Sequence, residues 1–257
     1  MAALFGSRII APAIAGWVIE AAGAEIALWF SAAWYVPAWL FLLPLRETVA
    51  QRAAGGGRLI ADLRDGFRVA VQHGEVRAVL LASVAANMFA WPVVQGFLPV
   101  FAEQVLEVGA GGLGLLVAAN GLGSLAGALS IAAMGDFPRK GRLFLAATAV
   151  FGLTLSAFAL TDRMAAGLGL IFLAGLASAG FGVLQSTLML LLSPEKARGR
   201  AMGVLMLSIG ALPLALLAQG AVAAAIGVVA TTAVSGVLLA STITLLALLT
   251  PRLWRLN

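Results

Sequence analysis

Six long stretches of this chain contain no Asp, Glu, Lys or Arg, and this feature constrains the fold more than any other. A helix needs about 20 mostly apolar residues to cross the hydrocarbon core of a bilayer. The charge-free stretches are residues 26–45, 78–102, 108–135, 143–161, 164–194 and 201–251. Charged residues make up 11% of the chain, whereas a soluble domain carries about a quarter. We therefore expect an all-α, polytopic membrane protein whose surface mostly faces lipid.

The six charge-free stretches, together with one further segment, predict eight spans. The last one, residues 201–251, is too long for one crossing and divides near residues 220–227. Residues 1–22 form one further candidate, interrupted by Arg8 and closed by Glu20. The eight predicted spans are 1–22, 26–45, 78–102, 111–134, 143–160, 165–192, 201–222 and 228–249.

Basic residues define one side of this predicted topology. Fifteen of the 16 Lys and Arg residues fall on one side of the spans, and Arg163 falls on the other. Lys and Arg are enriched in cytoplasmic loops. We therefore expect both termini in the cytoplasm and a location in the cell inner (plasma) membrane. Because the basic residues are confined to loops, the net charge of +5 does not indicate a nucleic-acid partner.

One polar segment divides the spans into groups of two and six. Residues 46–77 contain a glycine-rich connector, followed at 58–72 by apolar side chains that recur every four residues opposite charged ones. This pattern predicts an amphipathic helix on the inner membrane surface. The predicted domains are 1–45 with two spans, 46–77 as a cytoplasmic linker, and 78–257 with six spans.

Several loops resemble those of major facilitator superfamily transporters. Residues 193–202 are similar to the Pro-Glu-x-x-Arg-Gly-Arg-x-Met segment between helices ten and eleven in the branch that includes the enterobactin exporter. Residues 62–67 and 98–102 resemble the same branch, and 139–142 match the basic half of its loop between helices eight and nine. Exporters of this superfamily carry the motif Gly-Pro-x-x-Gly-Gly in helix five. The corresponding residues of this chain, 11–16, read Ala-Pro-Ala-Ile-Ala-Gly and so match the motif in part.

The resemblance implies a major facilitator fold of which this chain holds helices five to twelve. Residues 1–45 would be the last two helices of the N-terminal half, and the missing first four helices would be required for transport. The implied function is alternating-access export of a small amphipathic molecule such as a drug or siderophore. Protons are a candidate coupling ion, and no cofactor or metal is implied. The gating-loop residues implied by the resemblance are Arg139, Lys140, Gly141, Arg142, Arg198, Gly199 and Arg200.

Two alternatives to a transporter stay open. One is a truncated remnant that does not transport. The other, with less support, is a multi-pass membrane enzyme. Such an enzyme would need His, Asp or Glu side chains converging near the membrane surface, and none interrupts a proposed membrane core between residues 26 and 257.

Polar side chains recur at a four-residue spacing in the span 78–102, on one slowly drifting helix face. Further polar residues lie in the spans 111–134 and 165–192. The resemblance implies that the span 78–102 lines the transport path, and interhelical hydrogen bonding is the alternative role. The substrate-path candidates are Ser83, Asn87, Trp91, Gln95, Asn120, Ser178 and Gln185.

Small residues predict where helices pack closely. Gly123 and Gly127 repeat at the GxxxG spacing that lets two membrane helices approach each other. We expect their partner to be the first span, with Pro12 and Gly16 at the contact. Residues 109–114 also match G-x-G-x-x-G, but no strand precedes them, so we expect an outer turn there rather than a nucleotide site.

Overall fold

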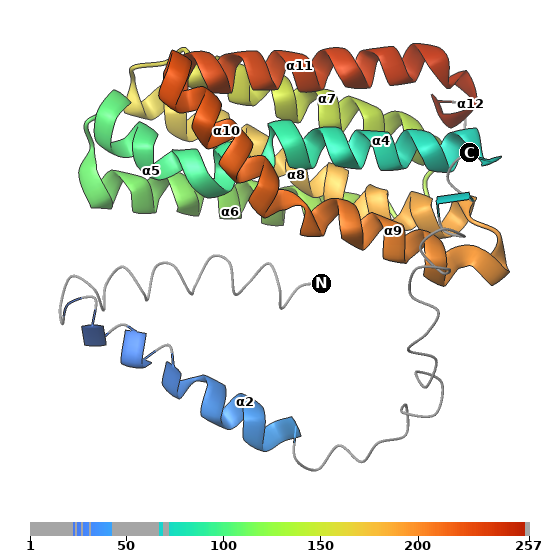
Figure 1. Cartoon of the computed structure of the whole chain (residues 1–257), viewed down its shortest axis with the longest axis horizontal. Coiled ribbons are helices and arrows are strands. Elements are labelled where there is room, and N and C mark those ends of the chain that lie inside the picture. Colours follow the sequence, from blue (N-terminus) through green and yellow to red (C-terminus); the bar gives the residue numbers. More distant parts are fainter. Residues whose placement is uncertain are drawn as a thin grey trace. The chain divides into compact units, whose positions relative to one another are not determined.

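The computed structural model describes residues 23, 25–26, 28–30, 32–42, 67–68 and 72–254. The chain divides into two compact units, Met1–Asp62 and Leu63–Asn257, and each is described by itself. Within the described residues, all regular secondary structure is helical (Figure 1).

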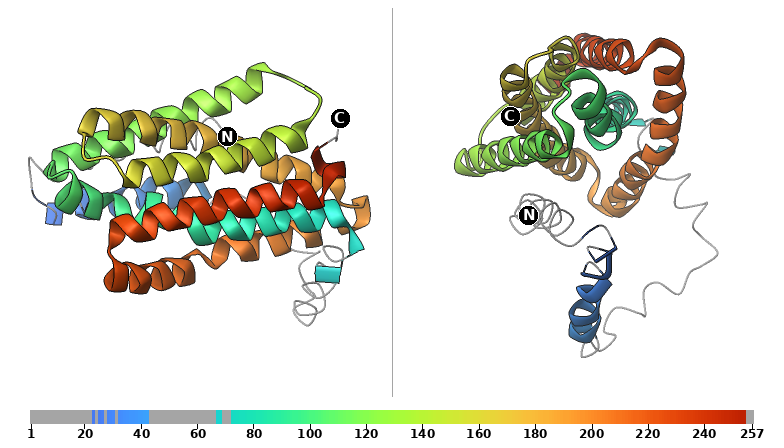
Figure 2. Two further views of the ribbon diagram at one scale, coloured as in Figure 1. Left: turned by 90° about the horizontal axis from the view of Figure 1, so that it is seen from above. Right: turned by 90° about the vertical axis from the view of Figure 1, so that its left-hand side faces the viewer.

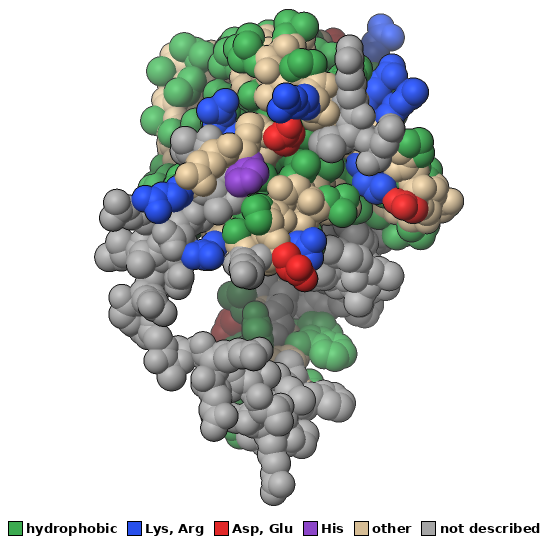
Figure 3. All heavy atoms as spheres, turned by 90° about the vertical axis from the view of Figure 1, so that its right-hand side faces the viewer, with side chains coloured by type: hydrophobic (Ala, Val, Ile, Leu, Met, Phe, Trp, Pro, Cys, Tyr) green, Lys and Arg blue, Asp and Glu red, His purple; other side chains and the backbone are tan. Residues whose placement is uncertain are grey.

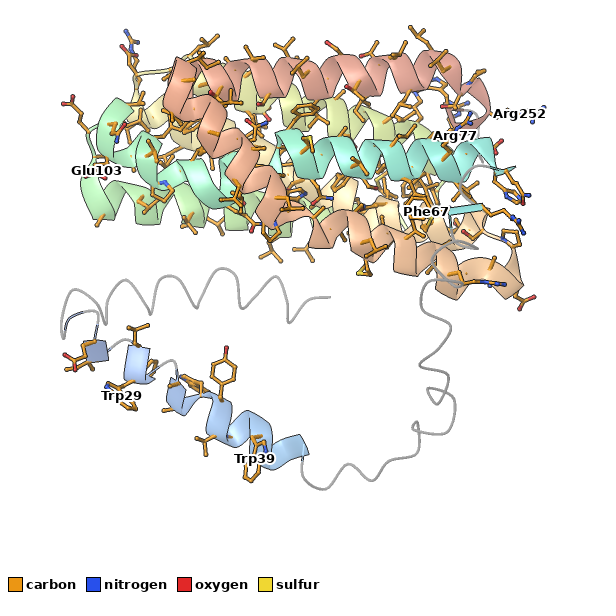
Figure 4. All side chains as sticks on the ribbon, viewed as in Figure 1. Trp29, Trp39, Phe67, Arg77, Glu103 and Arg252 are labelled. Carbon is orange, nitrogen blue, oxygen red and sulfur yellow. The ribbon has the colours of Figure 1, made fainter. Side chains whose placement is uncertain are left out.

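The first unit contributes helix α2, Tyr35–Leu42. The described aromatic side chains of this unit are exposed, Trp29 and Trp39 among them (Figure 4). The rings of Phe30 and Trp34 meet edge to face. The predicted span 1–22 lies outside the described residues, as does part of the span 26–45. Of the predicted interfacial helix 58–72, the structure describes Phe67, Arg68 and Gln72, and all three are helical.

The second unit contains, within its described part, six helices long and apolar enough to cross a membrane. They are Gly74–Val105, Gly109–Ala133, Lys140–Ala159, Met164–Leu192, Arg198–Ile226 and Val228–Leu249. The first comprises α4 (Gly74–Phe89), η1 (Val93–Phe97), α5 (Leu98–Val100) and η2 (Phe101–Val105). The others are α6 (Gly109–Ala133), α7 (Lys140–Ala159), α8 (Met164–Leu192), α9 (Arg198–Gly210) with α10 (Leu212–Ile226), and α11 (Val228–Leu249). Six of the eight predicted spans are thus confirmed.

Two tight turns connect neighbouring helices at the same end of this unit. Gly227, with φ of +85°, is the only residue between α10 and α11, which confirms the predicted division near 220–227. Glu107 and Gly109 also have positive φ, so the chain reverses there and α6 begins at Gly109. The expectation of a turn over all of 109–114 is therefore wrong. Two left-handed residues complete the reversal, and the following glycines are helical.

An apolar core holds the helices of the second unit side by side. Phe144, Phe151 and Phe158 recur every seven residues along α7 and are fully buried, a spacing that keeps one helix face toward its neighbours. The ring of Phe144 stacks on Phe181 of α8, and Phe158 contacts Phe101 of η2. In the end-on view of Figure 2, α4 lies among the other helices of this unit.

Basic residues gather at one end of the second unit, as the sequence predicts. Arg77 and Arg252 lie at one end and Glu103 at the other (Figure 4). Figure 3 looks onto the basic end, where α4, α7 and α9 begin. The described basic residues there include Arg77, Arg139, Lys140, Arg142, Arg198, Arg200 and Arg252. The opposite end carries Glu103, Glu107, Asp162 and Arg163.

Candidate functional site: a broken helix and its polar partners

The helix Gly74–Val105 is interrupted by two π-helical turns. Pro92 precedes the first, η1, and Pro99 lies between the first and the second. Proline has no backbone N–H, so each removes one bond from the helical ladder. In η1 the Leu98 N–H donates to the carbonyl of Val93, and in η2 the Leu106 N–H donates to Phe101. Such π turns inside α-helices are frequent at functional sites.

A glutamine on α10 compensates for the first proline. Since residue 92 cannot donate to the carbonyl four residues earlier, the Met88 carbonyl loses its helical donor. The amide Nε2 of Gln219 donates to this oxygen at 3.1 Å, and Ser235 of α11 donates to Gln219 Oε1 at 3.1 Å. One buried side chain thereby joins α4, α10 and α11 at the point where the first helix becomes irregular.

The same crossing is closely packed. A Cβ placed on Gly96 of η1 would lie 2.7 Å from the Leu216 side chain, one helical turn before Gln219 on α10. The lack of a side chain at residue 96 therefore lets α10 lie against the irregular segment.

Two substrate-path candidates from distant parts of the sequence meet directly. Gln185 Nε2 on α8 donates to Ser83 Oγ on α4 at 2.6 Å, and Ser83 Oγ donates in turn to the Val79 carbonyl. Asn87 is also buried and donates to the Ser83 carbonyl at 2.9 Å. Interhelical hydrogen bonding, the alternative role for these residues, is thus present between Ser83 and Gln185.

The other two candidates on this helix lie progressively farther from the interior. An α-helix turns about 100° per residue, so each four-residue step drifts about 40°, and the two steps from Ser83 to Trp91 move a side chain by about 80°. Gln95 lies beyond Pro92 in η1, where the helix is no longer α-helical. Ser83 and Asn87 are buried, Trp91 is half-buried with its ring edge to face with Phe151 at 5.8 Å, and Gln95 is exposed. The four residues therefore form a spiral from the core to the surface.

The remaining two candidates lie where α6 crosses α8. Ser178 Oγ donates to the Gly175 carbonyl at 2.7 Å, and Ser124 of α6 donates to the same oxygen at 3.2 Å. Asn120 lies beside them, since a Cβ on Gly175 would clash with the Asn120 carbonyl. Its Nδ2 is buried and has no hydrogen-bond partner among the described residues. A buried amide without a partner is a candidate contact for a bound molecule or water.

Gly123 and Gly127 form a helix-packing face, but with a different partner from the one expected. A Cβ on Gly123 would clash with the Phe172 carbonyl of α8, and one on Gly127 would lie 2.5 Å from the Leu176 carbonyl. The expectation that the first span fills this face is wrong at these two glycines, because the α8 backbone already occupies the space. Pro12 and Gly16 lie outside the described residues.

Lys140 and Asp136 form an ion pair in the basic loop before α7. The Lys140 Nζ also donates to the Phe137 carbonyl at 3.0 Å. The hydrogen bond from Lys140, and then its positive charge, hold the pKa of Asp136 below its ordinary value. Arg139 adopts φ of +66°, which turns the chain into α7.

Three of the other predicted gating residues contact neighbouring helices. The Arg142 guanidinium lies 5.1 Å from the ring centre of Trp254 in α12, Pro251–Trp254. Gly141 lies directly against the Leu253 backbone, where a Cβ would clash. Arg198 Nε donates to the Leu190 carbonyl of α8 at 3.0 Å, which ties the start of α9 to the end of α8. Gly199 and Arg200 lie in the first turn of α9.

Sequence reasoning missed Gln219 and Ser235. The signal was present, because a proline inside an apolar helix requires a donor for the carbonyl four residues earlier. Gln219 is the single Asn or Gln in the stretch 201–251 that could supply it.

In the described part of the chain, six apolar helices, one of them broken and supported by polar side chains, have the architecture of a multi-pass membrane protein. Residues 5–255 match the major facilitator family described as transmembrane secretion effector. The chain belongs to this family and is a membrane transporter of the major facilitator superfamily. No curated protein and no solved structure matches it.

Proposed function

We propose that this transporter exports a small amphipathic molecule by alternating access. The broken helix Gly74–Val105 is the observation that carries the proposal. An intact helix satisfies its own backbone and has one stable shape, whereas a helix with a freed carbonyl depends on a neighbour to satisfy it. Interrupted helices of this kind form substrate sites in many transporters. The freed Met88 carbonyl and its donor Gln219 therefore lie where such a site is expected.

The substrate path follows the spiral of polar residues in this proposal. Gln95 is exposed in the present conformation, and Asn120 has an amide without a described partner. Ser83, Asn87 and Gln185 are buried, so they would reach substrate only after the Gln185–Ser83 bond opens. Trp91 and Ser178 complete the path. Breaking one interhelical hydrogen bond costs about 0.6–1.7 kcal/mol in a membrane, which a bound substrate can supply.

The second unit would act as one half of the transporter. Major facilitator proteins pair two halves of six helices, and the loop resemblance assigns residues 78–257 to the C-terminal half, of the enterobactin-exporter type. Residues 1–45 would then be the last two helices of the other half, and transport would require that half in full. The basic end would face the cytoplasm of the inner membrane, and 139–142 and 198–200 would gate there.

Editing the gene at its native locus tests the export proposal in the whole protein. Efflux of ethidium and of enterobactin would be followed from preloaded cells that carry the parent gene, a deletion, Gln95→Leu or Gln104→Leu. Gln104 is the matched control. It is also an exposed glutamine on the helix Gly74–Val105, but it lies in η2, near the end of that helix. We expect the deletion to abolish efflux of at least one probe. Gln95→Leu should slow it by about fivefold, the loss of one hydrogen bond, and Gln104→Leu should leave it unchanged.

Efflux of both probes that is unaffected by the deletion would overturn the export proposal. Loss of efflux in the deletion with equal effects of Gln95→Leu and Gln104→Leu would keep export but remove Gln95 from the path.

A further inference from the structure

An apolar groove of about 510 Å³ runs between α7 and α11 and ends at α12. Its lining includes Leu145, Ala149, Ile243, Ala247, Pro251 and Trp254. It is separate from the polar spiral on α4, and the proposed transport mechanism does not use it.

The end of the groove is both rigid and positively charged. Leu253 of α12 is fully buried and its backbone lies against Gly141, which holds α12 on the start of α7. This contact presents Trp254 as the end wall of the groove. Arg142 lies over the face of Trp254, and Arg252 is exposed on the same short helix (Figure 4).

The length of the groove and the position of its charged end match those of a lipid in one leaflet. Arg142 and Ala149 are seven residues apart on α7, which is about 10 Å along the helix axis. One leaflet contributes about 15 Å of hydrocarbon. Arg142 at headgroup level would therefore place the groove within that leaflet, with Trp254 at the interface, where tryptophan is enriched.

We propose that this groove binds an anionic phospholipid of the surrounding bilayer. One acyl chain lies between α7 and α11, and the phosphate lies against the guanidinium groups of Arg142 and Arg252. Guanidinium groups bind phosphate through charge-assisted hydrogen bonds, and basic pockets between membrane helices select anionic headgroups. A groove that is apolar along its length and cationic at one end has the polarity of such a lipid.

Quenching of Trp254 by brominated lipids tests the proposal. The full chain would be reconstituted in phosphatidylcholine vesicles that contain a small share of either dibrominated phosphatidylglycerol or dibrominated phosphatidylcholine. The Trp254 signal is the difference between the parent and Trp254→Phe. We expect stronger quenching by the phosphatidylglycerol, and Arg142→Gln should reduce this preference by about fivefold. Arg198→Gln is the matched control, because it removes one charge at the same end but from a side chain bonded to α8.

A second variant tests the groove itself. Ala149→Phe would fill it and should reduce quenching of Trp254 by both lipids, while circular dichroism confirms that the helices are retained. Equal quenching of the parent by the two lipids would overturn the proposal in favour of an ordinary lipid annulus. Absence of quenching would also overturn it, because the groove would then be covered by protein.

Discussion

Gln219 should contribute to the stability of the protein, because Pro92 leaves the Met88 carbonyl without a helical donor. Replacing Gln219 by Leu removes the 3.1 Å bond to Met88 and the 3.1 Å bond from Ser235. Interhelical hydrogen bonds in membranes contribute about 0.6 kcal/mol on average and about 1.7 at most. We therefore expect Gln219→Leu to lower the free energy of unfolding by about 1–2 kcal/mol.

Pro92→Ala should remove most of this cost. Alanine at residue 92 restores an N–H that can donate to the Met88 carbonyl, so the bond from Gln219 becomes redundant. In this background Gln219→Leu loses the Ser235 bond alone, and its cost should fall to about 0.5 kcal/mol. The expected coupling energy between the two substitutions is therefore about 1 kcal/mol, within the range seen for residues that share a partner.

The assay is a double-mutant cycle on purified protein. The free energy of unfolding would be measured by circular dichroism as sodium dodecyl sulfate is added to protein in mild detergent micelles. Gln185→Leu is the matched control, because its bond to Ser83 does not depend on Pro92 and its cost should be the same in both backgrounds. An equal cost of Gln219→Leu with and without Pro92 would refute the reasoning.

Three further predictions concern helix packing, orientation and the basic loop. Gly175→Ala should destabilise the protein by about 1–3 kcal/mol, since its Cβ would clash with the Asn120 carbonyl, whereas Gly169→Ala, in open space, should be close to neutral in the same unfolding assay. Arg139→Cys and Ala197→Cys should react with an impermeant maleimide from the cytoplasm alone and Ala110→Cys from outside alone, and labelling of residue 139 from outside would contradict the topology. Lys140→Gln should raise the pKa of Asp136 toward its ordinary value, as measured by carboxyl NMR titration. Because the folded-state pKa is lowered, the ion pair stabilises at neutral pH and this contribution is lost as the pH falls through that pKa; an unchanged pKa would contradict the assignment.

The sequence predicted the membrane helices well, because their signal is local. A run of about 20 apolar residues has few other stable placements, so the six spans between Gly74 and Leu249 follow from composition and from Gly227. The gathering of Arg and Lys at one end follows from the same spans, because their order along the chain assigns each basic loop to a side.

Partners between helices were harder to predict, because they depend on which faces meet. Nothing local in the sequence distinguishes α8 from another helix as the partner of Gly123, since many helices carry small residues. Ser83 and Gln95 were assigned to one face, whereas the drift of a four-residue spacing and the irregular turn η1 separate a buried serine from an exposed glutamine. The role of Gln219 could have been predicted from Pro92, because proline leaves a defined acceptor without a donor.

Cysteine accessibility along residues 83–98 tests alternating access most directly. The chain has no cysteine, so each single substitution can be made in the parent sequence. We predict that Gln95→Cys reacts with an impermeant maleimide at once, whereas Ser83→Cys is protected and becomes reactive when ethidium is added. Ala82→Cys is the matched control, equally buried but outside the polar spiral, and it should stay protected under both conditions. Protection of residue 83 with and without ethidium, or equal exposure of residues 82 and 83, would contradict the proposed mechanism.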